Sequence, residues 1–139
     1  MRLRRNEKVE LIRRVPLFAK CSGRELAEVA QVADEIDLRE GKEMTREGAP
    51  GREFFVLLEG TADVRKGKRK INSLGPGDFF GEIALLTDRG RTATVTATSP
   101  VTLVVMAGRD LQMLERHAPE VSDRLKRVLG ERLERSATL

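Results

Sequence analysis

The residues best suited to chemistry lie in one segment, Gly75–Ala97, which reads GPGDFFGEIALLTDRGRTATVTA. Gly81 and Ala84 carry almost no side chain, so a ligand can approach the backbone closely there. The stretch GEIALL that begins at Gly81 is predicted to be a short helix, and free N–H groups at a helix start stabilise an anion. Glu82 accepts hydrogen bonds from hydroxyl groups, and the planar guanidinium of Arg91 suits a pair of phosphate oxygens. Together these groups suit a ligand with one phosphate charge beside a free ribose hydroxyl.

Each of these residues also has a simpler structural interpretation. Glu82 and Arg91 could pair with each other as an internal ion pair. Thr92 equally suits an ordinary strand position, and Phe79 and Phe80 are expected to point into the core. The structural interpretation and the ligand-binding interpretation therefore both remain open from composition and spacing alone.

Other kinds of functional site find no support in the sequence. The glycines match neither G-x-G-x-x-G nor a G-K-[ST] loop, so dinucleotide and nucleoside-triphosphate sites are unsupported. Cys21 is the only cysteine and His117 the only histidine, which argues against an intrachain disulfide, a metal site and a histidine-dependent triad. His117 is expected at a helix end, in a surface or capping role. We therefore predict no enzyme, no metal and no cofactor, and set aside a metal-dependent cupin as the runner-up double-sheet fold.

Three blocks of residues resemble the cyclic-nucleotide-binding domain family. FGEIALL at Phe80–Leu86, followed by RTATV at Arg91–Val95, looks like the phosphate-binding cassette of that family. FVLLEG at Phe55–Gly60 is similar to the strand and turn that precede the cassette, and VPLF at Val15–Phe18 to the entry into the first helix pair. The family includes protein kinase regulatory domains, cyclic-nucleotide-gated channels and the catabolite activator protein. The resemblance covers nearly the whole chain.

The resemblance implies a ligand, cAMP or cGMP, and a role for each matching residue. Arg91 would pair with the cyclic phosphate, and Glu82 would accept a hydrogen bond from the ribose 2′-hydroxyl. Backbone N–H groups would complete the cradle, and Thr92 could place its hydroxyl on the phosphate or on a syn guanine. The implied ligand-binding set is Gly81, Glu82, Ile83, Ala84, Arg91 and Thr92. The base is left open by this comparison.

Hydrophobic periodicity divides the chain into three zones. Residues 1–34 are predicted to be helical, because Ser22 and Glu25 have capping-box spacing before an i, i+3, i+4, i+7 stripe. Residues 35–107 alternate glycine-containing turns with runs of strand-forming residues. The clearest runs are Phe54–Leu58, Thr61–Arg65, Arg91–Thr98 and Val101–Met106. Residues 108–139 are predicted to be helical again, with Pro119 in the first turn of the last helix.

The predicted fold is mainly β with flanking helices. Many short strands suggest a barrel or a two-sheet roll, and the resemblance specifies a double-stranded β-helix, a jelly-roll-like β-roll. An N-terminal helix pair would precede the roll, and C-terminal helices would follow it. The whole chain, residues 1–139, is expected to be one cyclic-nucleotide-binding domain, with the cassette at residues 80–93.

The C-terminal helix is expected to respond to the ligand. The resemblance implies that this helix closes over the base as a lid, through Leu125, Val128, Leu129 or Arg132. The same apolar stripe equally suits a homodimer seam. The effector that reads this movement is not identified by the sequence.

Composition limits the location and partners of the chain. Its 139 residues, 40% of them hydrophobic, suffice for one core. No run approaches the roughly 20 apolar residues of a membrane span, and the arginine-rich start lacks the apolar core of a signal peptide. We therefore expect a cytoplasmic chain without a membrane partner. The net charge of +4, with both signs interleaved, fits an ordinary solvated surface or attraction to an anion.

Two alternative functions remain open from the sequence. One is a protein-interaction or scaffold module whose pocket is unoccupied. The other is a DNA-binding regulator, suggested by arginines near both ends of the chain, that lacks its helix-turn-helix module. In the related transcription factors this module follows the long C-terminal helix, at about the position where this sequence ends. Binding to nucleic acid by this chain alone is therefore not expected.

Overall fold

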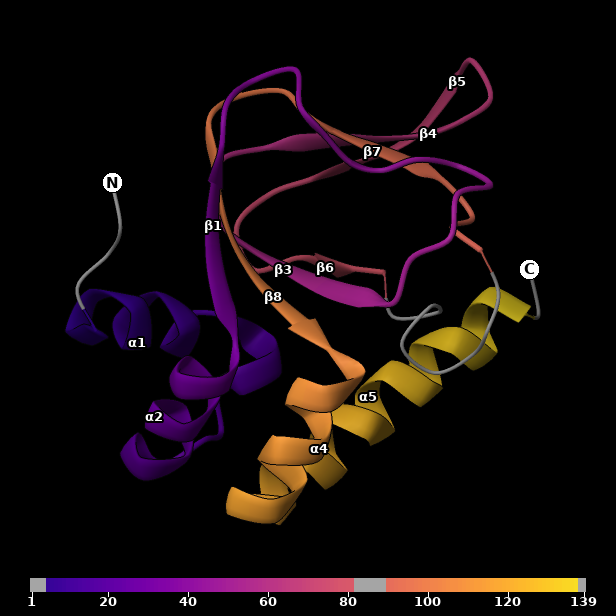
Figure 1. The fold of residues 1–139 in the computed structure, drawn as a ribbon. Coiled ribbons are helices and arrows are strands. Elements are labelled where there is room, and N and C mark those ends of the chain that lie inside the picture. Colours follow the sequence, from indigo (N-terminus) through magenta and orange to yellow (C-terminus); the bar gives the residue numbers. More distant parts are fainter. Residues whose placement is uncertain (1–4, 82–89, 138–139) are drawn as a thin grey trace.

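The structure is a computed structural model, which describes residues 5–81 and 90–137, with side chains described for residues 7–81 and 90–131. Helices lie at both ends of the chain and strands lie between them (Figure 1). The helices are α1 (Arg5–Arg13), the 3₁₀ helix η1 (Pro16–Phe18), α2 (Gly23–Val32), α4 (Gly108–His117) and α5 (Pro119–Ala137). In Figure 1 these helices gather below the sheets.

Eight described strands form two four-stranded antiparallel sheets. The strands are β1 (Asp34–Leu38), β2 (Glu43–Thr45), β3 (Glu53–Glu59), β4 (Ala62–Lys66), β5 (Arg69–Leu74), β6 (Phe79–Phe80), β7 (Thr94–Ala97) and β8 (Val101–Ala107). The strand order is β1-β8-β3-β6 in the first sheet and β2-β7-β4-β5 in the second. The chain passes repeatedly from one sheet to the other, as a β-roll requires. The predicted fold class, mainly β with flanking helices, is confirmed.

The central strand β3 is buried on both faces, which explains its unbroken apolar run. Phe54, Val56 and Leu58 pack into one hydrophobic cluster, with the helices. Phe55 and Leu57 pack into the other, between the two sheets. Because successive side chains on a strand point to opposite faces, one run of apolar residues supplies both cores. The first sheet therefore separates the interior of the roll from the helical layer.

The helical layer is fastened by polar contacts at the ends of α2. Ser22 and Glu25 form the predicted capping box, with hydrogen bonds of 2.8 and 3.2 Å. Glu25 also pairs with Arg124 of α5 at 2.9 Å. The pKa of Glu25 is lowered chiefly by the backbone N–H of Ser22, and further by Arg124. At the other end, Lys8 Nζ donates to the carbonyls of Ala30 and Ala33 at 2.7 and 2.6 Å, so that α1, α2 and α5 are joined.

The predicted helices and the strongest predicted strands are confirmed, with shifted ends. The first strand begins at Asp34, one residue before the predicted boundary. The run predicted as one strand over Arg91–Thr98 was wrong at its start, because β7 covers only Thr94–Ala97. The turn Gly75–Asp78 is present, with Gly75 N–H donating to Asp78 Oδ2 at 2.8 Å and a φ of +96° at Gly77. The short helix predicted to begin at Gly81 falls mostly on residues 82–89, outside the described part.

Candidate anion-binding site around Arg91

The backbone of Arg91 is fixed against the loop between β2 and β3. Its N–H donates to the carbonyl of Ala49 at 2.9 Å, and its carbonyl accepts from the N–H of Gly48 at 2.8 Å. Arg91 lies outside the strands, because β7 begins only at Thr94. These two bonds to the loop therefore take the place of strand-to-strand hydrogen bonds. The position of Arg91 is therefore set by contacts that do not involve its side chain.

The guanidinium of Arg91 occupies a narrow slot between two glycines and an aromatic ring. A Cβ added at Gly51 would lie 2.3 Å from Arg91 Nε, and one added at Gly81 would lie 2.8 Å from Nη1. Gly81 also has a φ of +86°, which side chains other than glycine rarely adopt. The Arg91 Cζ lies 5.5 Å from the centroid of the Phe55 ring, at cation–π distance. With Arg91 in this position, neither glycine can be replaced by a larger residue unless the guanidinium moves.

Arg91 is buried, and the described residues compensate its charge only weakly. It is 9% exposed, and burial lowers its pKa while the charge of Glu53 opposes the shift. Its side-chain hydrogen bond to a described residue is the long contact of 3.5 Å from Nη1 to the carbonyl of Gly81. Among the described residues, no carboxylate lies within ion-pair distance of it. A buried guanidinium with five N–H donors, of which few are paired with described residues, is suited to receive an anion.

Two phenylalanines of β6 support the slot and the helical layer from opposite faces. Phe80 stacks on Phe55 with ring centroids 4.9 Å apart and an interplanar angle of 13°. On the side of the helices, Phe79 packs edge-on against Phe54, with the ring centroids 5.8 Å apart. The aromatic pair in the roll interior thus backs the guanidinium with an apolar wall, which strengthens electrostatic interactions there. Both phenylalanines pack against a core cluster, as expected from the sequence.

Comparison with known proteins identifies this type of domain. The family model of the cyclic nucleotide-binding domain matches residues 35–117, which include Gly51, Gly81 and Arg91. The chain belongs to this family. The recognition made from the cassette residues is therefore confirmed, and a cyclic nucleotide-binding domain is a regulatory sensor module.

Relatives of this cyclic nucleotide-binding domain occur within larger proteins. A cAMP-dependent protein kinase regulatory subunit of Mycosarcoma maydis is 38% identical over 126 residues, which cover 76% of this chain and 23% of that protein. A cyclic nucleotide-gated potassium channel of Mesorhizobium japonicum is 34% identical over 123 residues, 88% of this chain and 34% of that protein. The chain thus spans about a third or less of the length of the curated relatives it matches.

A solved structure supports the fold over almost the full domain. The structure of "Sp-2Cl-cAMPS bound to PKAR CBD2" has a TM-score of 0.76 and 25% sequence identity, and covers 94% of this chain and 87% of that one. The two-sheet roll with flanking helices is therefore the cyclic nucleotide-binding fold. In that structure the bound molecule is named Sp-2Cl-cAMPS.

The structure brings together two of the six predicted ligand-binding residues, Gly81 and Arg91. Glu82, Ile83 and Ala84 lie outside the described residues. Thr92 directly follows Arg91 and is exposed, so the structure gives its hydroxyl no described partner and leaves its predicted role open.

The predicted lid residues of α5 lie in the helical layer. Leu125 and Leu129 are 2% and 0% exposed and belong to the cluster formed with the other helices. Val128 is half-buried, and the side chain of Arg132 is outside the described part.

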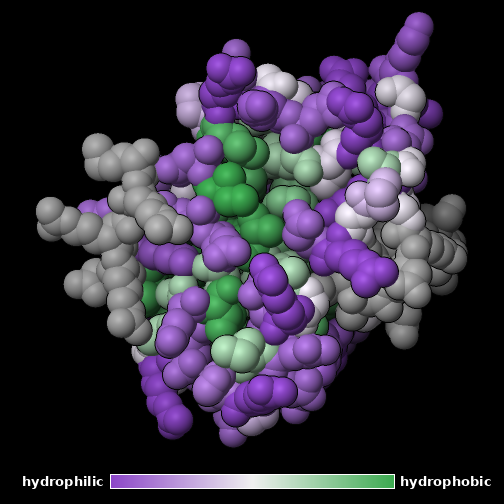
Figure 2. Space-filling view, in the orientation of Figure 1, coloured by the Kyte–Doolittle hydropathy of each residue, from purple (hydrophilic) through white to green (hydrophobic). Residues whose placement is uncertain are grey.

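Figure 2 shows a strip of hydrophobic side chains down the middle of the viewed face, with hydrophilic side chains on both sides.

The sequence prediction missed Gly51 and the carbonyl of Ala49. From the sequence, the glycines of this loop predict only turns between strands. The three-dimensional contact shows that Gly51 makes room for the guanidinium. Glycine-containing turns are expected between the strands, but nothing in local sequence predicts which distant side chain such a turn contacts.

Other kinds of site gain no support from the described residues. In those residues, no group of three or more His, Cys, Asp or Glu side chains is placed to hold a metal ion. His117 is exposed in the last turn of α4. Within the described part of the chain, no helix combines the length and apolar character needed to cross a bilayer.

Proposed function

We propose that this chain binds a cyclic nucleoside monophosphate, cAMP or cGMP, and acts as a regulatory sensor. The observation that carries this proposal is the buried guanidinium of Arg91, 9% exposed, in a slot made by Gly51 and Gly81. An ion pair confined to the protein would place a carboxylate beside it, and none of the described carboxylates takes that place. A cyclic phosphate has the single negative charge and the paired oxygens that a guanidinium binds best.

The remaining ligand contacts follow from the cassette. Glu82 accepts from the ribose 2′-hydroxyl, while the N–H groups around Gly81, Ile83 and Ala84 bind phosphate oxygens. Thr92 extends this set, and its exposed position leaves its hydroxyl accessible to a ligand. A guanine in the syn conformation would use that hydroxyl, whereas an adenine would not need it.

Calorimetric titration of the chain tests the proposal directly. With cAMP, cGMP and a cyclic dinucleotide as titrants, we expect saturable binding of at least one mononucleotide with a stoichiometry of one. The cyclic dinucleotide carries two phosphates, and among the described residues only Arg91 places a guanidinium in the slot, so we expect weaker binding of the dinucleotide. An absence of heat and of thermal stabilisation with every nucleotide would favour the alternative, a scaffold module with an unoccupied pocket.

We further propose that the ligand shifts α5 toward the roll, so that this helix closes over the base. Leu125 and Leu129 pack in the helical layer, so closure must exchange some of this packing for contact with the ligand. A ligand drives such a change only by its different affinity for the two states. We expect the backbone amide signals of residues 120–135 to shift when cAMP or cGMP is added in solution NMR. If those signals stay in place at saturation, α5 is not a lid.

The output of the sensor depends on the protein that carries it. Relatives place this domain in a kinase regulatory subunit and in a potassium channel. For this chain, the effector is a protein that reads the position of α5, or a second copy that pairs along it. The proposal includes both an effector protein and a second copy of the chain as the partner of α5.

A further inference from the structure

The hairpin of β4 and β5 forms a strongly basic projection from the roll. Five of the six residues from Arg65 to Lys70 are Lys or Arg, and all six positions are exposed. The hairpin projects at the upper right of Figure 1, away from the helical layer, and the same corner of Figure 2 is mainly hydrophilic. We refer to Arg65–Lys70 as the basic tip.

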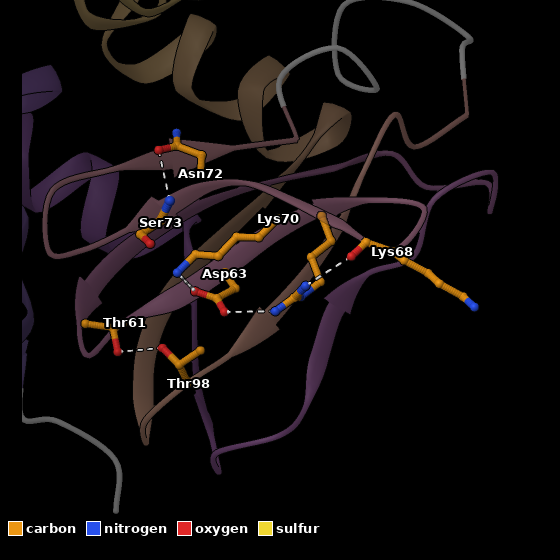
Figure 3. Close-up of polar contacts among 8 residues, drawn as sticks. Thr61, Asp63, Lys68, Lys70, Asn72, Ser73 and Thr98 are labelled. Carbon is orange, nitrogen blue, oxygen red and sulfur yellow. Dashed lines mark hydrogen bonds and ion pairs between the residues drawn. The ribbon is translucent and has the colours of Figure 1, made fainter.

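Only part of this charge is neutralised by described neighbours. Asp63, at the base of the tip, pairs with Lys70 at 3.2 Å and with Arg65 at 3.7 Å (Figure 3). Among the described residues, Lys66, Lys68 and Arg69 form no ion pair, and Figure 3 shows Lys68 pointing away from the hairpin. Three cations of the tip are thus available to a partner.

The basic tip is held in place. The N–H of Gly67, at the turn, donates to Glu47 Oε1 at 2.7 Å, and the N–H of Glu47 donates to Thr94 Oγ1 at 2.9 Å. The guanidinium of Arg65 also lies 3.4 Å from the carbonyl of Lys68. A fixed turn presents its charges without a large loss of conformational entropy on binding, which favours a docking role.

Protection of the sheet edge does not account for all of these charges. β5 is an edge strand, and edge strands are commonly guarded by lysines and bulges. Here the pairing register shifts beside Ile71, and Asn72 Oδ1 accepts from the N–H of Ser73 at 2.9 Å (Figure 3). These two features already disturb the free edge near the middle of β5. The cations at the turn are therefore in excess of what edge protection requires.

We propose that the basic tip docks on an anionic lipid surface. Clusters of four to eight Lys or Arg beside a membrane span or on an amphipathic helix bind acidic headgroups, and each residue near the surface contributes roughly 1 kcal/mol, or about fivefold in partitioning. We extend this rule to the five cations of the hairpin. Ile71, next to the tip, is 47% exposed and is one of two large hydrophobic residues exposed in the described part of the chain. A solitary apolar side chain beside cations is suited to the boundary between headgroups and acyl chains.

Single-stranded nucleic acid fits this tip less well. Single strands are bound largely by stacking on exposed aromatic residues. The chain has no Trp or Tyr, and its five Phe are buried or half-buried. Docking on lipid is peripheral and needs no membrane span, so it revises the expectation that the chain lacks a membrane partner. It does not depend on whether the Arg91 slot binds a nucleotide.

Vesicle sedimentation of the full chain tests the docking. The triple variant K66A/K68A/R69A is compared with K20A/R24A/R116A, which removes three exposed cations elsewhere and lowers the net charge of +4 by the same three units. On vesicles of phosphatidylcholine with phosphatidylserine, the tip variant is expected to lose roughly 100-fold in partitioning, while the control keeps most of its binding. Vesicles of phosphatidylcholine alone should bind neither variant nor the parent chain.

Three outcomes would overturn the proposal. These are absence of parent binding to the phosphatidylserine vesicles, an equal loss in both triple variants, and binding to an oligonucleotide in the same buffer without binding to vesicles. The variant K66R/K68R/R69K keeps all three charges and should bind as the parent does, which guards against a misfolded tip. Binding should also weaken as salt is added.

Discussion

Replacing Arg91 with alanine is expected to weaken binding of cAMP or cGMP by tens- to hundreds-fold, about 2–4 kcal/mol. Each charge-assisted hydrogen bond from the guanidinium to the phosphate is worth about 1.5–3 kcal/mol. In the variant, the phosphate would enter a site backed by Phe55 and Phe80 without its cation. Calorimetric titration of the parent chain and of R91A with the same nucleotide measures the difference.

The stability of the ligand-free protein separates the two interpretations of Arg91. If the residue served only as an internal ion pair, R91A would destabilise the fold. Burial lowers the pKa of Arg91, which means that the fold disfavours the charged side chain there. Without ligand, we therefore expect R91A to lose only the stability supplied by the Phe55 contact and by side-chain packing, whereas its affinity for the nucleotide falls strongly.

Two further variants control this experiment. Arg109, exposed at the start of α4, can be changed to alanine with the same loss of charge, and R109A should bind as the parent does. In G51A the guanidinium stays in the protein, but the new Cβ would lie 2.3 Å from its Nε and must displace it. Weakened binding in G51A therefore assigns the effect to the position of the charge. Unchanged affinity in both R91A and G51A would show that the nucleotide binds elsewhere.

The parts of the fold that sequence could predict are those with one-dimensional signals. Phe54–Leu58 is a continuous apolar run and Val101–Met106 is one interrupted only by Thr102, and both lie in central strands buried on two faces. The capping box of Ser22 and Glu25 predicted the start of α2 correctly because both partners lie within one turn. Arg91 and Gly81 could be chosen because the cassette spacing is distinctive.

The features that sequence missed depend on contacts between distant segments. β1 and β5 consist largely of charged or polar residues: the alternation in Asp34–Leu38 is too short to predict a strand by itself, and Arg69–Leu74 has no clear alternation. They become strands because neighbours offer backbone partners, β8 to β1 and β4 to β5. Likewise, the N–H of Arg91 bonds to the carbonyl of Ala49 in a distant loop, so the predicted strand begins only at Thr94. The apolar stripe of α5 predicted that one face of this helix is buried. It did not predict that the other helices cover that face.

Replacing Leu129 with alanine is expected to lower the free energy of unfolding by about 2–5 kcal/mol. Leu129 is 0% exposed and packs with Leu114 and Val121 in the helical cluster. The substitution removes apolar atoms and leaves a cavity that α4 and α5 can close only by moving together. Urea denaturation followed by circular dichroism measures the change from the midpoint and the slope of the transition.

Arg127 provides the matched control on the same helix, because it is exposed two residues away. R127A should change stability by less than about 0.5 kcal/mol. A loss below about 1 kcal/mol in L129A would mean that α5 contributes little to the ligand-free fold, since buried Leu to Ala changes cost more than this. That result would also weaken the lid proposal. A helix that is hardly held in the helical layer has no packed state to leave, so the ligand would order α5 and not exchange one packing for another.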